Sequence, residues 1–208
     1  MLKIALVSFL FVALQDGPKR EMGPAEIRPR EPKPLEKRVN AAVIPVYVSK
    51  DNKVAATSNV VPVDILTKYL VKSEQFRIVD AAAVKAATEA LTKDPKAPHP
   101  TPAQLGKAVG VPYVFAANVL KDEIETRESL VGGRARKSAT VLLLQLIRVS
   151  DGQVLSSMQS NGTGERGLKP DEKDDGADGT KDAAITADAL RMAIVAIFDA
   201  LVDAVPSE

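Results

Sequence analysis

The chain has 208 residues, 45% of them hydrophobic, and a formal net charge of +1 at neutral pH. This length suits one domain with appended segments, and the apolar fraction is sufficient for a sizeable core. The balanced charge gives no electrostatic reason to expect nucleic-acid binding. Because the sequence contains no cysteine, it excludes disulfides, thiolate metal sites, cysteine nucleophiles and an acylated cysteine.

The N-terminal residues have the pattern of an export signal. Lys3 is followed by an apolar run from Ile4 to Leu14. A run this short predicts a signal peptide over residues 1–16, with an uncleaved anchor or a buried strand as alternatives. Residues 17–38 are rich in proline and in charges of both signs, which predicts a flexible, extended tether.

We expect one folded domain over residues 39–208. Its first half is expected to run strand, helix, strand, helix, helix, at Ala41–Val48, Val61–Val71, Phe76–Val79, 80–91 and Thr101–Val109. Pro45 indicates an edge strand or a bulge. Asp80 and Thr101 are the expected N-caps of the last two helices, and Gly110 is the expected C-terminal stop.

The second half predicts an antiparallel meander followed by a helix. Val111–Leu120 and Ala139–Val149 are mostly apolar, with a charged insert and a Val131-Gly132-Gly133 turn between them, and Asp151-Gly152 is a turn signal before a third strand. Gly164–Gly179 is expected to be a mobile loop. The predicted fold class is therefore α/β, a mixed sheet with a C-terminal antiparallel meander and helices packed on its faces.

The last helix is expected at Ala183–Val205. Its apolar side chains recur at helical spacing, at Leu190, Ile194, Ile197, Phe198, Leu201 and Val205. Charged residues lie between them, which favours packing on the sheet over a membrane span. Phe198 is expected to be buried, and Asp199 is expected to tolerate replacement by alanine.

Two sequence motifs suggest ligands but fit them poorly. Gly162–Gly167 matches GxGxxG, yet Leu168–Asp171 is no helix start, so a strand-to-loop exit is favoured over a dinucleotide site. Asp171–Asp182 resembles a calcium loop, but Lys173 occupies a ligand position, which favours a solvated acidic loop.

The remaining candidate groups are scattered. His99, between two prolines, is interpreted as a solvated loop residue. Arg134, Arg136 and Lys137 could contact phosphate, anionic lipid or glycan, although a charged hairpin tip that prevents edge pairing is favoured. Asn161-Gly162-Thr163 matches a glycosylation acceptor. No spacing connects the three further titratable residues, Asp80, Lys107 and Asp122. The sequence therefore predicts no catalytic, cofactor-binding or metal-binding residue.

Three segments in order, Phe76–Asp80, Leu105–Gly110 and Ile147–Leu155, resemble the CsgG family of bacterial envelope proteins. Its relatives include LpoB-like activators of penicillin-binding proteins, PelC-like proteins and the TolB N-terminal domain. The resemblance covers roughly residues 40–205 and implies a mixed sheet, an envelope location and a scaffolding or ring-forming role without catalysis. The sequence departs from this family in two ways. It lacks the family's usual lipidated cysteine, and its charged insert between Val119 and Thr140 lacks the pattern of the membrane-spanning hairpins of the channel-forming members.

The expected function is that of a non-catalytic scaffold or assembly protein of the bacterial cell envelope, exported to the periplasm and involved in outer-membrane biogenesis. It would bind copies of itself or another envelope protein, with no cofactor and no nucleic acid, and peripheral membrane or glycan contact is left open. Exposed sheet edges are the expected contact surface. The alternative is a small-ligand-binding or hydrolytic domain that uses the loops at one end of the sheet.

Overall fold

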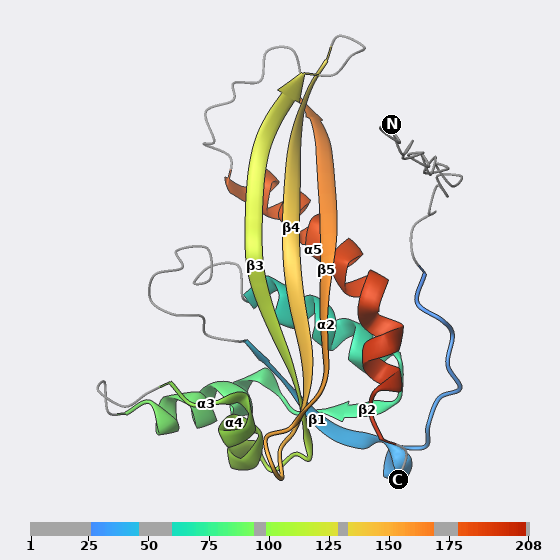
Figure 1. The fold of residues 1–208 in the computed structure, drawn as a ribbon, viewed down its shortest axis with the longest axis vertical. Helices are drawn as coiled ribbons and strands as arrows, with labels where there is room; N and C mark the ends of the chain where they lie inside the picture. Colours follow the sequence, from blue (N-terminus) through green and yellow to red (C-terminus); the bar gives the residue numbers. More distant parts are fainter. Residues whose placement is uncertain (1–25, 46–59, 94–98, 129–132, 169–178, 207–208) are drawn as a thin grey trace, which may run out of the picture.

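The structure is a computed structural model, and it describes residues 26–45, 60–93, 99–128, 133–168 and 179–206 (Figure 1). One short 3-10 helix, η1, precedes the sheet. The elements in chain order are η1 Leu35–Lys37, β1 Val39–Pro45, α2 Val60–Lys72, β2 Phe76–Ile78, α3 Ala81–Leu91, α4 Pro102–Val109, β3 Tyr113–Glu128, β4 Arg134–Arg148, β5 Val154–Leu168 and α5 Gly179–Asp203. The predicted signal segment, residues 1–16, lies outside the described residues.

The sheet has five strands in the order β2-β1-β3-β4-β5. β1 is parallel to both of its neighbours, and β3, β4 and β5 are antiparallel. This confirms the mixed sheet with a C-terminal meander. The edge position expected from Pro45 is wrong, because β1 lies between two strands. Pro45 is nevertheless tolerated there, since it ends the strand and is paired only on the β3 side.

Local signals in the sequence set several element ends. The Asp80 carboxylate accepts a hydrogen bond of 2.8 Å from the Ala82 amide at the start of α3. Thr101 forms a capping box with Gln104 at the start of α4, and Gly110 ends that helix with a φ of 73°. Each device satisfies backbone groups that a helix end leaves unpaired.

The main core lies between the sheet and the helices α2 and α5. Four residues of the expected α5 stripe are fully buried in it, namely Leu190, Ile194, Phe198 and Leu201. Phe198 lies against Tyr69 of α2, with ring centroids 5.9 Å apart. A smaller cluster on the other side of the sheet, around Ile44, Leu105 and Val114, is covered by α3 and α4. Helices therefore pack on both faces near β1, as expected.

Residues 26–33 form a strap along α5, although they were expected to belong to a flexible tether. Arg28 and Arg30 point to the same side of the extended segment and meet Asp199 and Asp203, which are one helical turn apart on α5. The strap is also bound to the loop before β2, where the Lys33 amide donates to the Glu74 carbonyl at 3.2 Å. Paired charges therefore hold these residues against α5.

The three meander strands extend much further than expected. β3 continues through the charged insert to Glu128, and β4 starts at Arg134, so the insert is the outer half of one long hairpin (Figure 1). β5 runs to Leu168, through the first part of the expected mobile loop. Most of the expected Val131–Gly133 turn and of the 164–179 loop lies outside the described residues. Among the helices described, none is both long enough and apolar enough to cross a membrane.

Candidate interaction surface

Two glycines in β5 allow α5 to lie directly on the strand. A Cβ atom added to Gly162 would lie 1.7 Å from the carbonyl oxygen of Ala189, and one added to Gly164 would lie 2.1 Å from that of Ile185. No side chain fits in such a gap. The GxGxxG match is therefore part of a helix-packing strand. It is neither a dinucleotide loop nor the strand-to-loop exit that was favoured, because β5 continues through it.

Under the first turns of α5, the sheet is polar. Asp122, an early candidate for chemistry, accepts hydrogen bonds from the hydroxyls of Ser138 and Thr140 at 3.2 and 3.1 Å. Ser138 and Thr140 are almost completely buried. The Asp122 carboxylate thus satisfies buried hydroxyl groups, which is a structural task.

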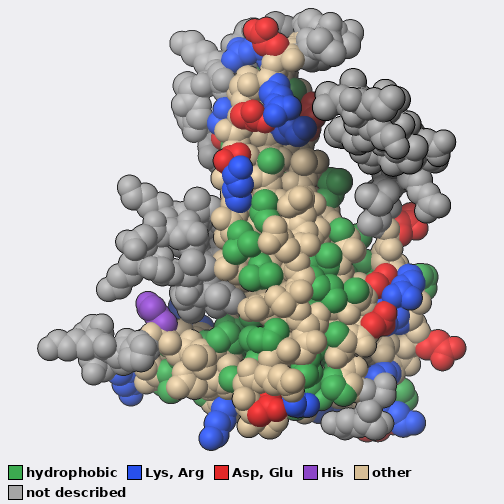
Figure 2. All heavy atoms as spheres, viewed as in Figure 1, with side chains coloured by type: hydrophobic (Ala, Val, Ile, Leu, Met, Phe, Trp, Pro, Cys, Tyr) green, Lys and Arg blue, Asp and Glu red, His purple; other side chains and the backbone are tan. Residues whose placement is uncertain are grey.

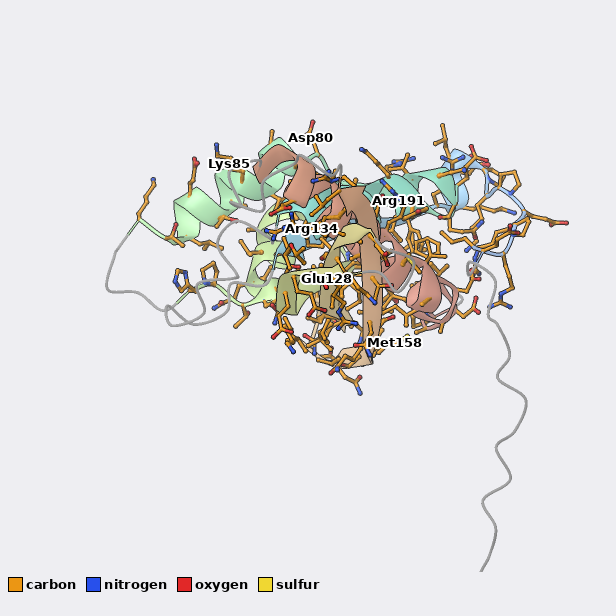
Figure 3. The ribbon with its side chains drawn as sticks, turned by 90° about the horizontal axis from the view of Figure 1, so that it is seen from above. Asp80, Lys85, Glu128, Arg134, Met158 and Arg191 are labelled. Atoms are coloured by element: carbon orange, nitrogen blue, oxygen red, sulfur yellow. The ribbon has the colours of Figure 1, made fainter. Side chains whose placement is uncertain are left out.

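The basic cluster expected at the hairpin tip is divided between the two faces of the hairpin. Arg136 faces α5 and forms a two-pronged ion pair with Asp182, at 3.1 and 2.8 Å. Lys137 points to the opposite face, because successive strand residues alternate. Arg134 lies at the hairpin end with Glu128 (Figure 3). This division provides no convergent anion site.

The other candidate residues do not meet. Asp80 caps α3, and α3 lies at the opposite end of the molecule from the hairpin tip (Figure 1). Lys107 lies in the last turn of α4, and His99 is exposed before that helix. Within the described ranges, no three His, Asp or Glu side chains are arranged to hold a metal ion. A cleft of about 520 Å³ between the strap, α2 and α5 contains none of these candidates.

The face of the meander opposite α5, here called the open face, has an apolar centre. A bulge between Val119 and Lys121 places Leu120 beside Lys121, opposite Val141 of β4. Leu143 is two residues further along β4 on the same face. Leu120 is 40% exposed, and Val141 and Leu143 are half-buried.

Uncharged polar residues of β4 and β5 flank this centre, and charged residues follow from Lys121 towards the hairpin end. Gln145 of β4 and Gln159 and Asn161 of β5 lie on the same face as Leu143. Figure 2 shows hydrophobic side chains over the middle of the strands and charged ones near the tip. Among the described helices, α3 and α4 pack on this side only near β1 and the adjoining strand ends. An apolar centre with a polar surround is the usual anatomy of a protein-binding surface.

Sequence reasoning missed the open face. Leu142, Leu144 and Leu146 point towards α5, and the residues that alternate with them point to the open face. This alternation cannot be recognised in the sequence, because Val141 and Leu143 are apolar too. A continuous apolar run predicts burial on both faces. The one signal that could have revealed the surface is the charged and polar composition of the neighbouring strands.

No protein-family model and no curated protein sequence matches the chain. Among solved structures, the chain is similar to lipoprotein GNA1162 from Neisseria meningitidis, with 15% identity over 71% of this chain and 94% of that one and a TM-score of 0.40. The LpoB C-terminal domain from Salmonella enterica is 16% identical over 60% of this chain and 82% of that one, with a TM-score of 0.35. A PelC dodecamer from Paraburkholderia phytofirmans is 14% identical over 82% of this chain and 93% of that one, with a TM-score of 0.33. All three of these structures are of bacterial proteins, and the first is of a lipoprotein.

Proposed function

We propose that the chain is a non-catalytic scaffold protein of the bacterial cell envelope with a CsgG-like domain, and that it binds a partner protein through the open face. The observation that carries this proposal is the apolar centre formed by Leu120, Val141 and Leu143 on a face that no described helix covers at that level. Exposed apolar groups within a polar surround favour association, because their burial removes them from water.

The envelope setting rests on the sequence. The short apolar run after Lys3 is typical of a signal peptide. In the structure, the strap places the start of the described chain on the outside of α5. Peripheral contact of the charged hairpin end with a membrane or glycan stays a prediction.

Binding is favoured over catalysis by what the polar groups do. Asp80 caps a helix, and Asp122 is engaged by two buried hydroxyls. A catalytic site needs titratable groups that converge on one reacting atom. These carboxylates instead serve separate structural tasks, so among the described residues they do not support the alternative of a hydrolytic site.

The test is a double substitution on the open face, Leu120→Lys with Leu143→Lys, in the full-length chain. Leu91→Lys is a matched control, because Leu91 is 42% exposed at the end of α3, away from the meander. Tagged variants are cross-linked in cells, and the captured proteins are compared by mass spectrometry. We expect the double variant to lose a partner that the wild type and Leu91→Lys retain, with an unchanged melting temperature. Identical partners for all three would refute the open face as the binding surface.

A further inference from the structure

Asn118 of β3 is a buried polar residue whose side-chain carbonyl oxygen, Oδ1, has no hydrogen-bond donor among the described residues. The residue is 7% exposed, and Oδ1 itself is almost completely buried. It is the only uncharged side chain in the described ranges with such an atom. The buried hydroxyls of Ser138 and Thr140 differ, because both donate to Asp122. A buried acceptor without a donor destabilises the folded chain, so its presence calls for an explanation.

The local structure gives the Asn118 amide no task. It lies within β3, away from any turn or helix end that its side chain could cap. In the sequence it interrupts the apolar run Val114–Leu120, and asparagine is disfavoured in strands. An apolar residue at this position would fit both the strand and its buried surroundings better. A residue that breaks the local pattern in this way is expected at functional positions.

Asn118 lies on the open face, beside its apolar centre. Val119 packs in the core on the α5 side, so Asn118 and Leu120 point to the opposite side. In the ladders Asn118 lies opposite Leu143, which in turn lies opposite Gln159. The unbonded acceptor is therefore next to the apolar side chains of the centre. Leu120 is 40% exposed, and an exposed side chain changes rotamer within nanoseconds, which can uncover the acceptor.

We propose that Asn118 is the polar anchor of the open face, and that its Oδ1 accepts a hydrogen bond from the indole N–H of a tryptophan in the partner protein. This inference deepens the proposed function and rests on it. The free chain carries the cost of the unbonded acceptor, and binding removes that cost.

An indole complements this position better than other donors do. It has one donor and no acceptor, and its ring is a large apolar surface. A hydroxyl or a peptide group would bring an oxygen that the apolar centre leaves unbonded, and lysine or arginine would bring a charge that is costly to bury. Tryptophan is also enriched among the residues that dominate binding energy at interfaces. Because the 208 residues contain no tryptophan, the proposal selects a different protein as partner over a second copy of this chain.

The first test separates stability from binding. Asn118→Leu in the full-length chain keeps a side chain that branches at the same carbon and removes the unbonded acceptor. Its melting temperature should rise by roughly 2–8 °C, and capture of the partner by cross-linking in cells should fall roughly tenfold or more. Thr140→Val is the matched control, because its hydroxyl is buried but bonded to Asp122, so it should lose stability and keep capture. A lower melting temperature for Asn118→Leu, or unchanged capture, would overturn the proposal.

The second test uses the wild-type protein with indole and 1-methylindole as probes, followed by NMR. The two probes share the ring, and only indole has the N–H donor. Indole should shift the methyl signals of Leu120 and Leu143, and 1-methylindole should bind roughly three- to tenfold more weakly. Asn118→Leu should bind both probes alike. Equal affinities in the wild type would overturn the proposal.

The third test identifies the residue that occupies the anchor. Gln159 is exposed on the same face, so the photo-cross-linker p-benzoylphenylalanine in its place should capture a partner peptide that contains tryptophan. Capture of a second copy of this chain, or of a peptide without tryptophan, would contradict the anchor. If the Leu120→Lys, Leu143→Lys variant loses the partner and Asn118→Leu keeps it, the anchor is refuted and the proposed function stands. Capture that is unchanged in both variants would refute the proposed function itself, and the anchor with it.

Discussion

Gly162 and Gly164 determine how closely α5 approaches the sheet. Both lie in β5 where the backbone of the helix occupies the space of a side chain. The small Ala189 and Ala193 on the helix complete this contact and are fully buried. The close approach seals the outer half of the core without large side chains, which suits a chain with few aromatic residues.

Replacing Gly162 by alanine is expected to destabilise the protein. The new Cβ would lie 1.7 Å from the Ala189 carbonyl oxygen, a backbone atom that moves only if α5 shifts. Overpacking of this kind costs about 1–3 kcal/mol of unfolding free energy. Gly167→Ala is the control, since nothing lies within 4 Å of its added Cβ. Urea denaturation compares the two, and equal stabilities would show that α5 does not rest on β5 as described.

Phe198→Ala should lower the free energy of unfolding by about 3–5 kcal/mol, because the ring is fully buried against Tyr69 and the core. The expectation that Asp199→Ala is harmless has to be revised, since Asp199 binds Arg28 and Arg30. Asp188→Ala is the better control, because its ion pair with Arg191 is exposed. Thermal unfolding of both variants checks this, and a small effect at Phe198 would make α5 peripheral to the core.

At the level of the elements, the strap converts part of a proline-rich segment into a fixed component of the domain. Burial by itself would raise the pKa of Asp199, but the Arg28 amide and the Arg30 guanidinium hold it below its usual value. The hydrogen bond from Arg30 likewise lowers the pKa of Asp203. A carboxylate whose pKa is lower in the folded state contributes stability above its unfolded pKa, about 3.9, and loses it as the pH falls through the folded value.

The strap should therefore stay bound at neutral pH and detach below about pH 4. The Arg28 amide donates to Asp199 at 3.0 Å, so its hydrogen-exchange protection factor reports attachment directly. We expect protection at pH 6 that is lost at pH 3, and little protection at pH 6 in Asp199→Asn. Asp188→Asn serves as control. Protection that does not change with pH would mean that the ion pairs do not hold the strap.

The same contact changes the expected outcome of limited proteolysis at neutral pH. Cleavage after Arg30 should be slow in the wild type, because its side chain is engaged by Asp199 and Asp203 of α5. A double Asp199→Asn, Asp203→Asn variant should be cut there faster. A wild-type core that starts near Val39, as a free tether would give, would contradict the described strap.

At the scale of the whole molecule, the long meander and α5 extend well beyond the part of the sheet that α3 and α4 cover (Figure 1). This elongation creates the open face. A compact sheet covered on both sides would not offer it. The shape thus favours a protein that contacts other proteins over one that encloses a substrate.

Export from the cytoplasm is the prediction that belongs to the whole chain. The apolar run that follows Lys3 should direct a C-terminally tagged copy to the envelope fraction. Replacing Leu10 and Leu14 by arginine should retain the protein in the cytosol, because a charged run cannot serve as a signal core. Recovery of the unmodified full-length protein in the cytosol would rule out the predicted location.

The sequence by itself determined the order of the elements and most of their ends. Asp80, Thr101 and Gly110 act through hydrogen bonds and backbone angles within a few residues of themselves, so local pattern was sufficient to place them. The α5 stripe was equally readable, because helical periodicity depends on one segment alone.

The tertiary structure decided the rest, because those features depend on residues far apart in the chain. Arg28 meets Asp199 only because strap and helix lie side by side, and Gly162 is required only because α5 crosses it. The open face follows from which side of β4 the helix covers, and an apolar run such as 141–147 gives no indication of that side. Long-range contacts therefore make residues 26–33 and 162–168, which resemble a tether, a loop and a nucleotide motif in the sequence, parts of the packed domain. The same contacts leave exposed the surface on which the proposed function depends.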